Sequence, residues 1–204
     1  MGRPLKVLAL GAAALALALV LGWWRVDGPG AEPLPELGAR PLPLAEMAFT
    51  LTDHEGNAVG PESLLGRPSL VFFGFTHCPD VCPMGLATMA DVMDALGPEA
   101  AQVQPLFVTV DPERDTPAAL AEYVPRFHPA LIGLSGTPEQ IERTAKTFAV
   151  YRERVEDPAA PDGYTMGHTS SILLFDPEGA FVRTYEPDRK SQEIAADLTD
   201  RIDA

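Results

Sequence analysis

Basic residues are scarce in this chain, which holds 15 Lys and Arg against 29 Asp and Glu and carries a formal charge of −14 at pH 7. Nucleic-acid binding depends on Lys and Arg that meet phosphates, so this deficit excludes nucleic acid as an expected partner. Three of the bases lie within residues 1–25, which contain no acid, so the rest of the chain is more acidic still. Such a composition indicates a soluble body, with docking of a basic protein as the alternative.

Cysteine is scarcer still, because Cys78 and Cys82 are the only two in the chain. Neither lies near the N-terminus, so anchoring as a lipoprotein is excluded. The sequence also contains no internal repeat, which argues against a repeat architecture. With 204 residues, 46% of them hydrophobic, the composition instead predicts one domain with short appendages.

An apolar run over residues 7–24 follows Arg3 and Lys6 at the N-terminus. As a helix it would extend about 27 Å, enough for a thin or tilted crossing of a bilayer. No A-x-A cleavage site comes after the run, which favours an uncleaved signal anchor over a cleaved signal peptide.

The chain is therefore predicted to have three parts: a membrane anchor over residues 1–26, a proline-rich linker over 27–45 and a folded domain over 46–204. The basic flank of the anchor is expected to stay in the cytoplasm. We therefore expect a single-pass protein of a bacterial-type cytoplasmic membrane, with its C-terminal domain on the periplasmic side. A dithiol in that oxidising compartment needs a metal or a reductant to avoid becoming a disulfide.

Strands and helices alternate along the predicted domain, which indicates an α/β protein. A buried strand leads directly into the cysteine motif, and a helix follows it, as in a thioredoxin-like fold with an inserted segment and a closing β-hairpin. A further short strand is expected between the second and third helices. Strands are predicted over 47–52, 69–75, 103–110, 171–175 and 180–185, and helices over 86–96, 116–125, 137–148 and 194–202.

The two cysteines have the spacing C-x-x-x-C, one residue longer than a thioredoxin dithiol. One helical turn brings residues i and i+4 onto one face, so both sulfurs can point to one spot. The positive end of the helix dipole favours the thiolate form there. Two such thiolates either close into a disulfide or hold a soft metal such as Cu(I).

A third ligand must come from four histidines. His77 adjoins Cys78, and its side chain is expected to diverge from the sulfurs. His168 lies in the loop that enters the strand before the last hairpin, and in a thioredoxin fold this loop faces the dithiol. From the residues alone, a solvent-facing loop histidine is as good an interpretation as a ligand. The other two are His54, in an early turn, and His128, between elements.

Three motifs together resemble the Sco/SenC/PrrC family over residues 45–200. The motifs are GFTHCPDVCP at 74–83, VDPERDTP at 110–117, and GHTS at 167–170 followed by DPEG at 176–179. The resemblance implies a thioredoxin-like domain that binds one copper per monomer, Cu(I) with Cu(II) as a second oxidation state. The ligands that it implies are Cys78, Cys82 and His168.

The resemblance also implies a function, assistance in assembling the dinuclear copper centre of cytochrome c oxidase. The implied partners are the copper-bearing subunit of the oxidase and, in addition, another periplasmic copper carrier or a thiol reductant. On this interpretation the protein is a metallochaperone rather than an enzyme. Cu(I) would then move between sites by ligand exchange.

Two positions depart from the family pattern. Phe75 stands where a tyrosine is often found, which removes a hydroxyl and keeps a ring. Gly167 stands where an aspartate frequently precedes the histidine, and such an aspartate could orient the imidazole. Met166 and the methionines of helix 86–96 are interpreted as core residues, since those of the helix keep helical spacing.

Two acidic features keep two interpretations each. The segment 111–117 either contacts a partner near the metal face or simply forms a turn followed by a helix cap. Asp80, inside the cysteine motif, either has a functional role, in tuning the pKa of a thiolate or docking a partner, or serves as an acid at a helix N-terminus.

A thiol–disulfide oxidoreductase is the competing function, in which Cys78 attacks, Cys82 resolves and the copper-ligand cysteines of the oxidase stay reduced. The extra residue between the cysteines argues for metal over a redox dithiol. A peroxiredoxin-like peroxidase ranks low because Thr76 lies two residues before Cys78 rather than three. A structural disulfide would close a very short loop and contribute little entropically.

Overall fold

The computed structural model describes residues 40–202 of the chain. The predicted anchor over 1–26 and most of the predicted linker lie outside these residues. Within 40–202 no helix combines the length and apolarity that a bilayer crossing requires.

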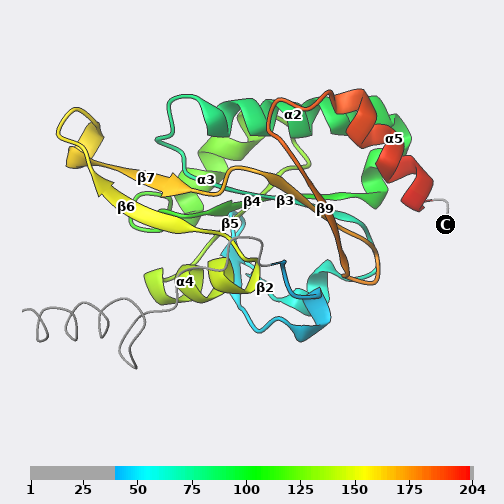
Figure 1. Cartoon of the computed structure of the whole chain (residues 1–204), viewed down its shortest axis with the longest axis horizontal. Helices are drawn as coiled ribbons and strands as arrows, with labels where there is room; N and C mark the ends of the chain where they lie inside the picture. The colour runs from blue at the N-terminus through cyan, green and yellow to red at the C-terminus, as the bar shows by residue number, and fades with distance from the viewer. Residues whose placement is uncertain (1–39, 203–204) are drawn as a thin grey trace, which may run out of the picture. The chain divides into compact units, whose positions relative to one another are not determined.

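A seven-stranded mixed sheet forms the centre of the domain, with the strand order β2-β1-β5-β4-β3-β8-β9 (Figure 1). The three central strands β3, β4 and β5 are parallel, and antiparallel hairpins flank them on both sides. The strands are β1 (Leu51–Asp53), β2 (Ala58–Val59), β3 (Ser69–Gly74), β4 (Gln104–Thr109), β5 (Ile132–Ser135), β8 (Ile172–Phe175) and β9 (Phe181–Tyr185).

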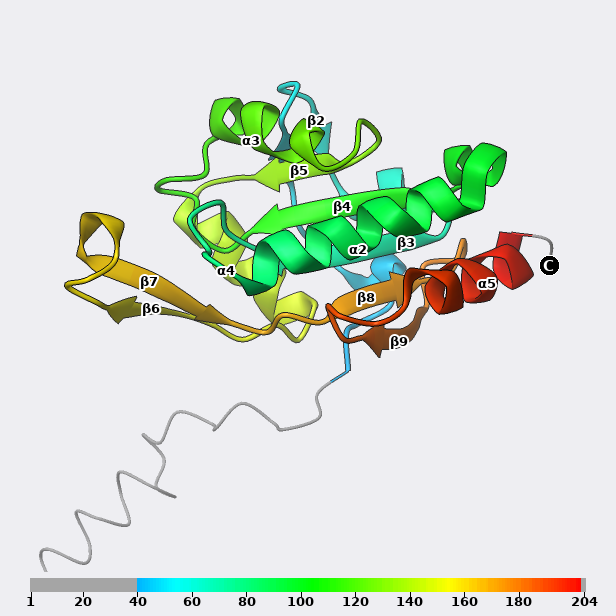
Figure 2. The ribbon, with the colours of Figure 1, turned by 90° about the horizontal axis from the view of Figure 1, so that it is seen from above.

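Helices cover both faces of this sheet (Figure 1). α2, α3 and α5 lie on one face, and α4 lies on the other with the early 3-10 turns (Figures 1 and 2). The helices are α2 (Val81–Leu96), α3 (Pro117–Tyr123), α4 (Pro138–Thr147) and α5 (Ser191–Ile202). The 3-10 turns are η1 (Leu44–Glu46), η2 (Pro61–Leu64), η3 (Gly97–Gln102), η4 (Val124–Arg126) and η5 (Pro161–Gly163).

Adjacent phenylalanines of β3 supply the core on the two faces. Phe72 stacks on Phe107 of β4 with ring centroids 6.4 Å apart, and Phe73 packs against Phe148 on the opposite face at 5.2 Å. All six residues of β3 are buried, because both faces of a parallel strand are covered. This explains why the strand appears in the sequence as an unbroken apolar run.

The second sheet is a two-stranded hairpin of β6 (Arg152–Glu156) and β7 (Tyr164–His168). It projects beyond the main sheet at the end where α2 begins (Figure 2). This hairpin is the inserted segment, and the prediction that His168 lies in a loop was wrong, because it is the last residue of β7. The sequence did not predict β6, because this strand is exposed along most of its length and therefore has no apolar run.

The predicted thioredoxin-like arrangement is otherwise confirmed. The expected strand before α4 is β5, and the closing hairpin is β8–β9, which α5 follows. α2 begins earlier than the apolar stripe indicated, directly at the cysteine motif.

Candidate metal centre

The cysteine loop lies between the end of β3 at Gly74 and the start of α2 at Val81. Cys82 is the second residue of α2 and is buried, whereas Cys78 precedes the helix and is half-buried. The backbone N–H of Cys82 donates to the Cys78 sulfur at 3.4 Å. The sulfurs therefore converge because the loop turns back onto the helix start, and not because both cysteines share a helical turn as the spacing had suggested.

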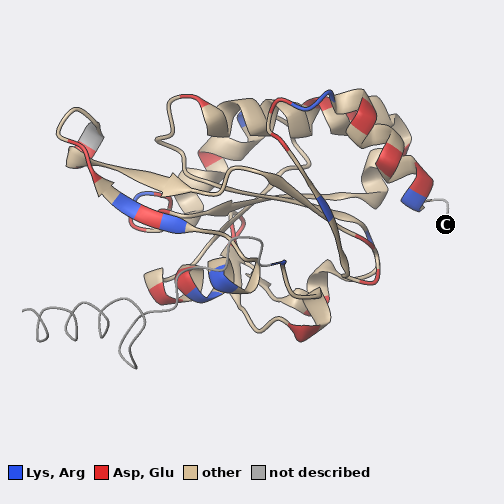
Figure 3. Ribbon diagram, in the orientation of Figure 1, with Lys and Arg blue, Asp and Glu red and all other residues tan. Residues whose placement is uncertain are grey.

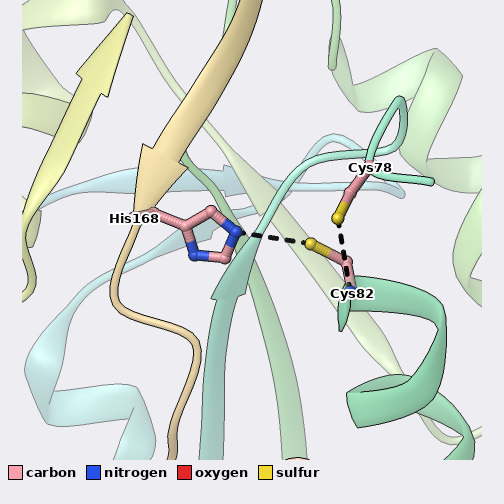
Figure 4. Close-up of side chains that lie close together, drawn as sticks. All are labelled: Cys78, Cys82 and His168. Carbon is pink, nitrogen blue, oxygen red and sulfur yellow. Dashed lines mark hydrogen bonds between the residues drawn. The ribbon is translucent and has the colours of Figure 1, made fainter. Parts of the chain in front are cut away.

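His168 approaches this pair from the other sheet (Figure 4). Its Nε2 lies 3.4 Å from the Cys82 sulfur. The two sulfurs and one imidazole nitrogen all lie within 4.8 Å of one another. The structure thus brings together the three residues that the sequence singled out, from segments 86 residues apart.

A backbone carbonyl determines the tautomer of His168, and so which ring nitrogen has a lone pair for a metal. Nδ1 lies 2.9 Å from the carbonyl oxygen of Thr169. A carbonyl oxygen only accepts hydrogen bonds, so Nδ1 carries the proton and the neutral ring has its lone pair on Nε2. The ring also packs edge-on against Phe75 at 5.8 Å. The imidazole is therefore oriented for ligation without the aspartate that Gly167 replaces.

The two thiols differ in acidity. Hydrogen bonds lower the pKa of Cys78 to about 4, chiefly one from the Cys82 thiol, against the opposing effect of burial. Hydrogen bonding to the Cys78 thiolate and burial raise the pKa of Cys82. The pair therefore loses its first proton from Cys78, the more accessible sulfur.

The donor set fits a soft cation. Two thiolate sulfurs and one imidazole nitrogen at one point form a three-coordinate pocket of the kind that Cu(I) accepts. No carboxylate belongs to this cluster among the described residues, so hard cations such as Mg²⁺ or Ca²⁺ lack their preferred oxygen ligands.

The other three histidines lie outside the metal cluster and make hydrogen bonds elsewhere in the described domain. His77 is exposed and its Nδ1 lies 3.0 Å from the Thr76 hydroxyl, in agreement with the predicted divergence from the sulfurs. His54 accepts from the backbone N–H of Gly133. His128 accepts from the N–H of Ala130 and lies near Asp94.

The methionine interpretation is confirmed where it concerned the core. Met166 of β7 is buried, and so are Met89 and Met93 of α2. Met84, in the first turn of α2, is instead 39% exposed.

Both ambiguous acidic features can now be placed. Thr116 caps α3, because its hydroxyl accepts from the N–H of Ala119 at 3.2 Å, as the cap interpretation required. Asp80 is the N-cap residue of α2 but makes no side-chain cap bond. Asp111 and Asp115 are buried, which the sequence did not reveal, since acidic residues next to Pro and Arg usually indicate an exposed turn.

The chain matches the SCO1/SenC family over residues 39–203. It is 37% identical over 192 residues to the mitochondrial SCO1 homolog of Homo sapiens, a match that covers 91% of this chain but only 62% of the human protein. It superposes on the copper-bound structure of Bradyrhizobium japonicum ScoI with a TM-score of 0.72 and 44% identity, over 80% of this chain and 99% of that one.

A second similar structure is that of BsSco, a member of the Sco family of cytochrome c oxidase assembly proteins in which a disulfide switch was identified. The identity there is 28% and the TM-score 0.60, over 76% of this chain and 91% of that one.

Proposed function

The chain belongs to the SCO1/SenC family, and on that premise we propose that it is a copper metallochaperone that assists assembly of the dinuclear copper centre of cytochrome c oxidase. Cu(I) is its cargo, held one per chain by Cys78, Cys82 and His168. The observation that carries the proposal is the convergence of these three donor atoms within 4.8 Å. The oxidase subunit that bears the copper centre is the proposed acceptor, and a second periplasmic copper carrier is the proposed donor.

Transfer is proposed to proceed by ligand exchange. A thiolate of the acceptor displaces one of the three ligands, and the remaining two are then displaced in turn. Cys78 is suited to be the first or last ligand in this sequence, because it is the more accessible thiol and stays deprotonated at neutral pH. Cys82 is the one buried ligand of the three, and it retains the ion until the acceptor has engaged.

Cu(I) titration of the reduced protein, read by metal analysis and by competition with a chromophoric chelator, tests this function. We expect one Cu(I) per wild-type chain and none for Cys78→Ser/Cys82→Ser. His168→Ala is expected to weaken Cu(I) binding by about 10- to 100-fold, since even indirect partners of a ligand change metal affinity by that much. His128→Ala is the matched control, because this imidazole lies outside the cluster, and it should bind as the wild type does. Equal copper binding by wild type and the double serine variant would refute the proposal.

We further propose that residues 1–26 anchor the protein in a bacterial-type cytoplasmic membrane, with the domain on the periplasmic side. The support is the apolar run after Arg3 and Lys6 and the absence of a clean cleavage site after it. The test is fractionation of cells that express the full chain, with extraction at alkaline pH. An anchored protein stays in the membrane pellet at full length, whereas a shortened chain in the soluble periplasmic fraction would contradict the anchor.

A thiol–disulfide oxidoreductase is the second candidate, and the lowered pKa of Cys78 is the observation that favours it. The Cys78 thiolate would attack a disulfide of the oxidase subunit and release one partner thiolate. Cys82 would then displace the second partner thiolate, which leaves the partner reduced by two electrons and this pair oxidised to a disulfide. An external thiol reductant would restore the pair.

His168 separates the two functions, because reduction of a disulfide needs no third ligand. The chaperone function predicts that His168→Ala loses both tight copper binding and support of oxidase assembly. A His168→Ala protein that loses copper but fully supports assembly would assign the redox function instead.

A further inference from the structure

The turn after β4, residues 111–115, contacts both segments that carry the metal ligands, the cysteine loop and strand β7. A different carboxylate makes each contact. Its first carboxylate, Asp111, is 3% exposed, and its last, Asp115, is fully buried. The backbone N–H of Asp115 donates to the carbonyl oxygen of Asp111 at 2.9 Å, so the two carboxylates are held in one tight turn.

Asp115 holds the cysteine half. Thr76, two residues before Cys78, donates twice to this carboxylate, from its backbone N–H at 3.0 Å and from its hydroxyl at 2.6 Å. A third bond comes from the hydroxyl of Thr109 on β4 at 2.7 Å, which ties the same carboxylate to the central sheet. The start of the cysteine loop is thereby fixed to the sheet by a buried group outside the loop.

Asp111 holds the histidine half. It accepts from the hydroxyl of Tyr164 at 3.1 Å, and Tyr164 begins the strand that ends at His168. Arg114 pairs with Asp111 and places its guanidinium carbon 3.9 Å from the centre of the Tyr164 ring. The hairpin β6–β7 projects from the main sheet (Figure 2), and Tyr164 pairs with Glu156 at the end of the hairpin next to its turn. These contacts therefore tie the far end of the hairpin to residues 111–114, while His168 ends β7 at the opposite end.

We propose that residues 111–115 act as a positioning brace that sets the separation of His168 from the two cysteines. This inference rests on the proposed copper-binding function. The Asp115–Thr76 bonds form the cysteine arm of the brace, and the Asp111–Tyr164 bond forms its histidine arm. Neither carboxylate is a ligand, because neither belongs to the cluster of donor atoms.

The brace has a physical role because the ligands sit on elements that no strand pairing connects. The cysteine loop follows β3, whereas His168 lies on a separate two-stranded sheet. A three-coordinate site releases its ion more readily when one ligand can move away, so fixing both ligand-bearing segments to one turn slows release.

Two variants remove one arm each and leave all ligands in place. Thr76→Val removes the hydroxyl bond to Asp115, and Tyr164→Phe removes the bond to Asp111 while the ring remains. We expect each to release Cu(I) to a chelator about five-fold faster than wild type, the size expected for loss of one hydrogen bond. We also expect a shift of the thiolate-to-Cu(II) charge-transfer band of the Cu(II)-loaded protein. Thr76→Ser, which keeps the hydroxyl, is expected to restore wild-type behaviour.

Matched controls remove similar hydroxyl bonds away from the brace. Thr88→Val loses a 2.6 Å bond from α2 to the carbonyl of Pro187, and Tyr185→Phe loses a bond from β9 to Asp197 on α5. Both should release Cu(I) at the wild-type rate. Release by Thr76→Val and Tyr164→Phe that is no faster than that of the controls would overturn the proposal.

A measurement without copper separates failure of the brace from failure of the copper function. In the reduced metal-free protein, the imidazole NMR signals of His168 should shift in Tyr164→Phe and stay unchanged in Tyr185→Phe. Unchanged signals in both variants would overturn the brace. A wild-type protein that binds no copper would refute the chaperone function, and the imidazole signals would still decide for or against the brace.

Discussion

At the residue scale, two glycines border the metal site and differ in the space around them. Gly74 ends β3 beneath the cysteines, and a Cβ atom there would lie 2.8 Å from the ring of Phe107 and 3.0 Å from the Cys82 sulfur. Gly167 precedes His168, and a Cβ atom there would meet its nearest neighbour, Val155, at an ordinary 3.7 Å. Glycine is therefore required by close packing at the first position and not at the second.

Gly74→Ala is expected to lower the free energy of unfolding by about 1–3 kcal/mol, the usual cost of overpacking a buried site. It should also weaken Cu(I) binding, since the Cys82 sulfur must move. Urea unfolding and chelator competition measure the two effects. Gly167→Ala is the matched control and should leave both within error, and a Gly74→Ala protein of wild-type stability would contradict the packing argument.

At the residue scale the cysteines were predictable and the brace was not. The residue type and the spacing of Cys78 and Cys82 are enough to predict a dithiol or a soft-metal site. Asp115 and Tyr164 give no such signal, because an acid or a tyrosine near a turn is usually exposed and only its burial makes it structurally important. Nor does the sequence show that the Thr169 carbonyl orients the imidazole in the absence of an aspartate at position 167.

At the scale of the element, the N-terminus of α4 forms as its sequence predicts. The hydroxyl of Thr137 accepts from the backbone N–H of Gln140, and the Gln140 side chain accepts from the N–H of Thr137, which completes a capping box. Such local signals are readable because both partners lie within four residues.

Thr137→Ala removes this cap and is expected to cost about 1 kcal/mol. For a domain of this size that corresponds to a decrease in Tm of roughly 2–4 °C. Differential scanning calorimetry checks the value, and Thr137→Ser, which keeps the hydroxyl, should restore it. An unchanged Tm for Thr137→Ala would show that the cap contributes nothing to global stability.

Asp197 links α5 to β9 and gives a pH dependence. Burial raises the pKa of this carboxyl, but the Tyr185 hydroxyl together with Arg201 and Arg183 outweighs that effect, and the pKa is lowered below 3.8. A carboxyl with a lowered pKa stabilises the fold above its unfolded pKa and loses that contribution as the pH falls through the folded value.

Asp197→Asn should therefore be less stable than wild type at neutral pH, and the difference should shrink as the pH falls below 3.8 and the carboxylate of the wild type becomes protonated. Urea unfolding as a function of pH measures it. A difference that stays constant with pH would mean that the ionised carboxylate is not the stabilising form.

At the scale of the whole molecule, copper binding and folding are coupled. The ligands come from the cysteine loop with the start of α2 and from β7, so only the folded chain presents all three. A ligand that binds only the native state stabilises it by mass action, by about 2.7 kcal/mol at a free concentration 100 times the Kd.

Cu(I) buffered at that level should raise the Tm of the reduced protein by roughly 5–10 °C. Addition of a stronger Cu(I) chelator should reverse the shift. Cys78→Ser/Cys82→Ser should show no shift, and a shift of the same size in that variant would place the stabilising ion elsewhere on the molecule.

Charge is also a property of the whole molecule. Acidic residues are spread over helices and loops, whereas β6 alternates basic and acidic side chains (Figure 3). The broad acidity agrees with the composition, but its distribution around the metal site depends on the fold.

By itself, the sequence determined the thioredoxin-like order of elements, the thiol pair and the motifs that pointed to His168. These are local signals, carried by apolar periodicity, cap residues and spacing. Only the tertiary structure decided that His168 ends a strand, that its Nε2 faces the sulfurs, and that a buried turn connects both halves of the site. These features involve contacts between residues dozens of positions apart. They depend on burial and on the packing of a hairpin whose first strand, β6, has no apolar periodicity in the sequence.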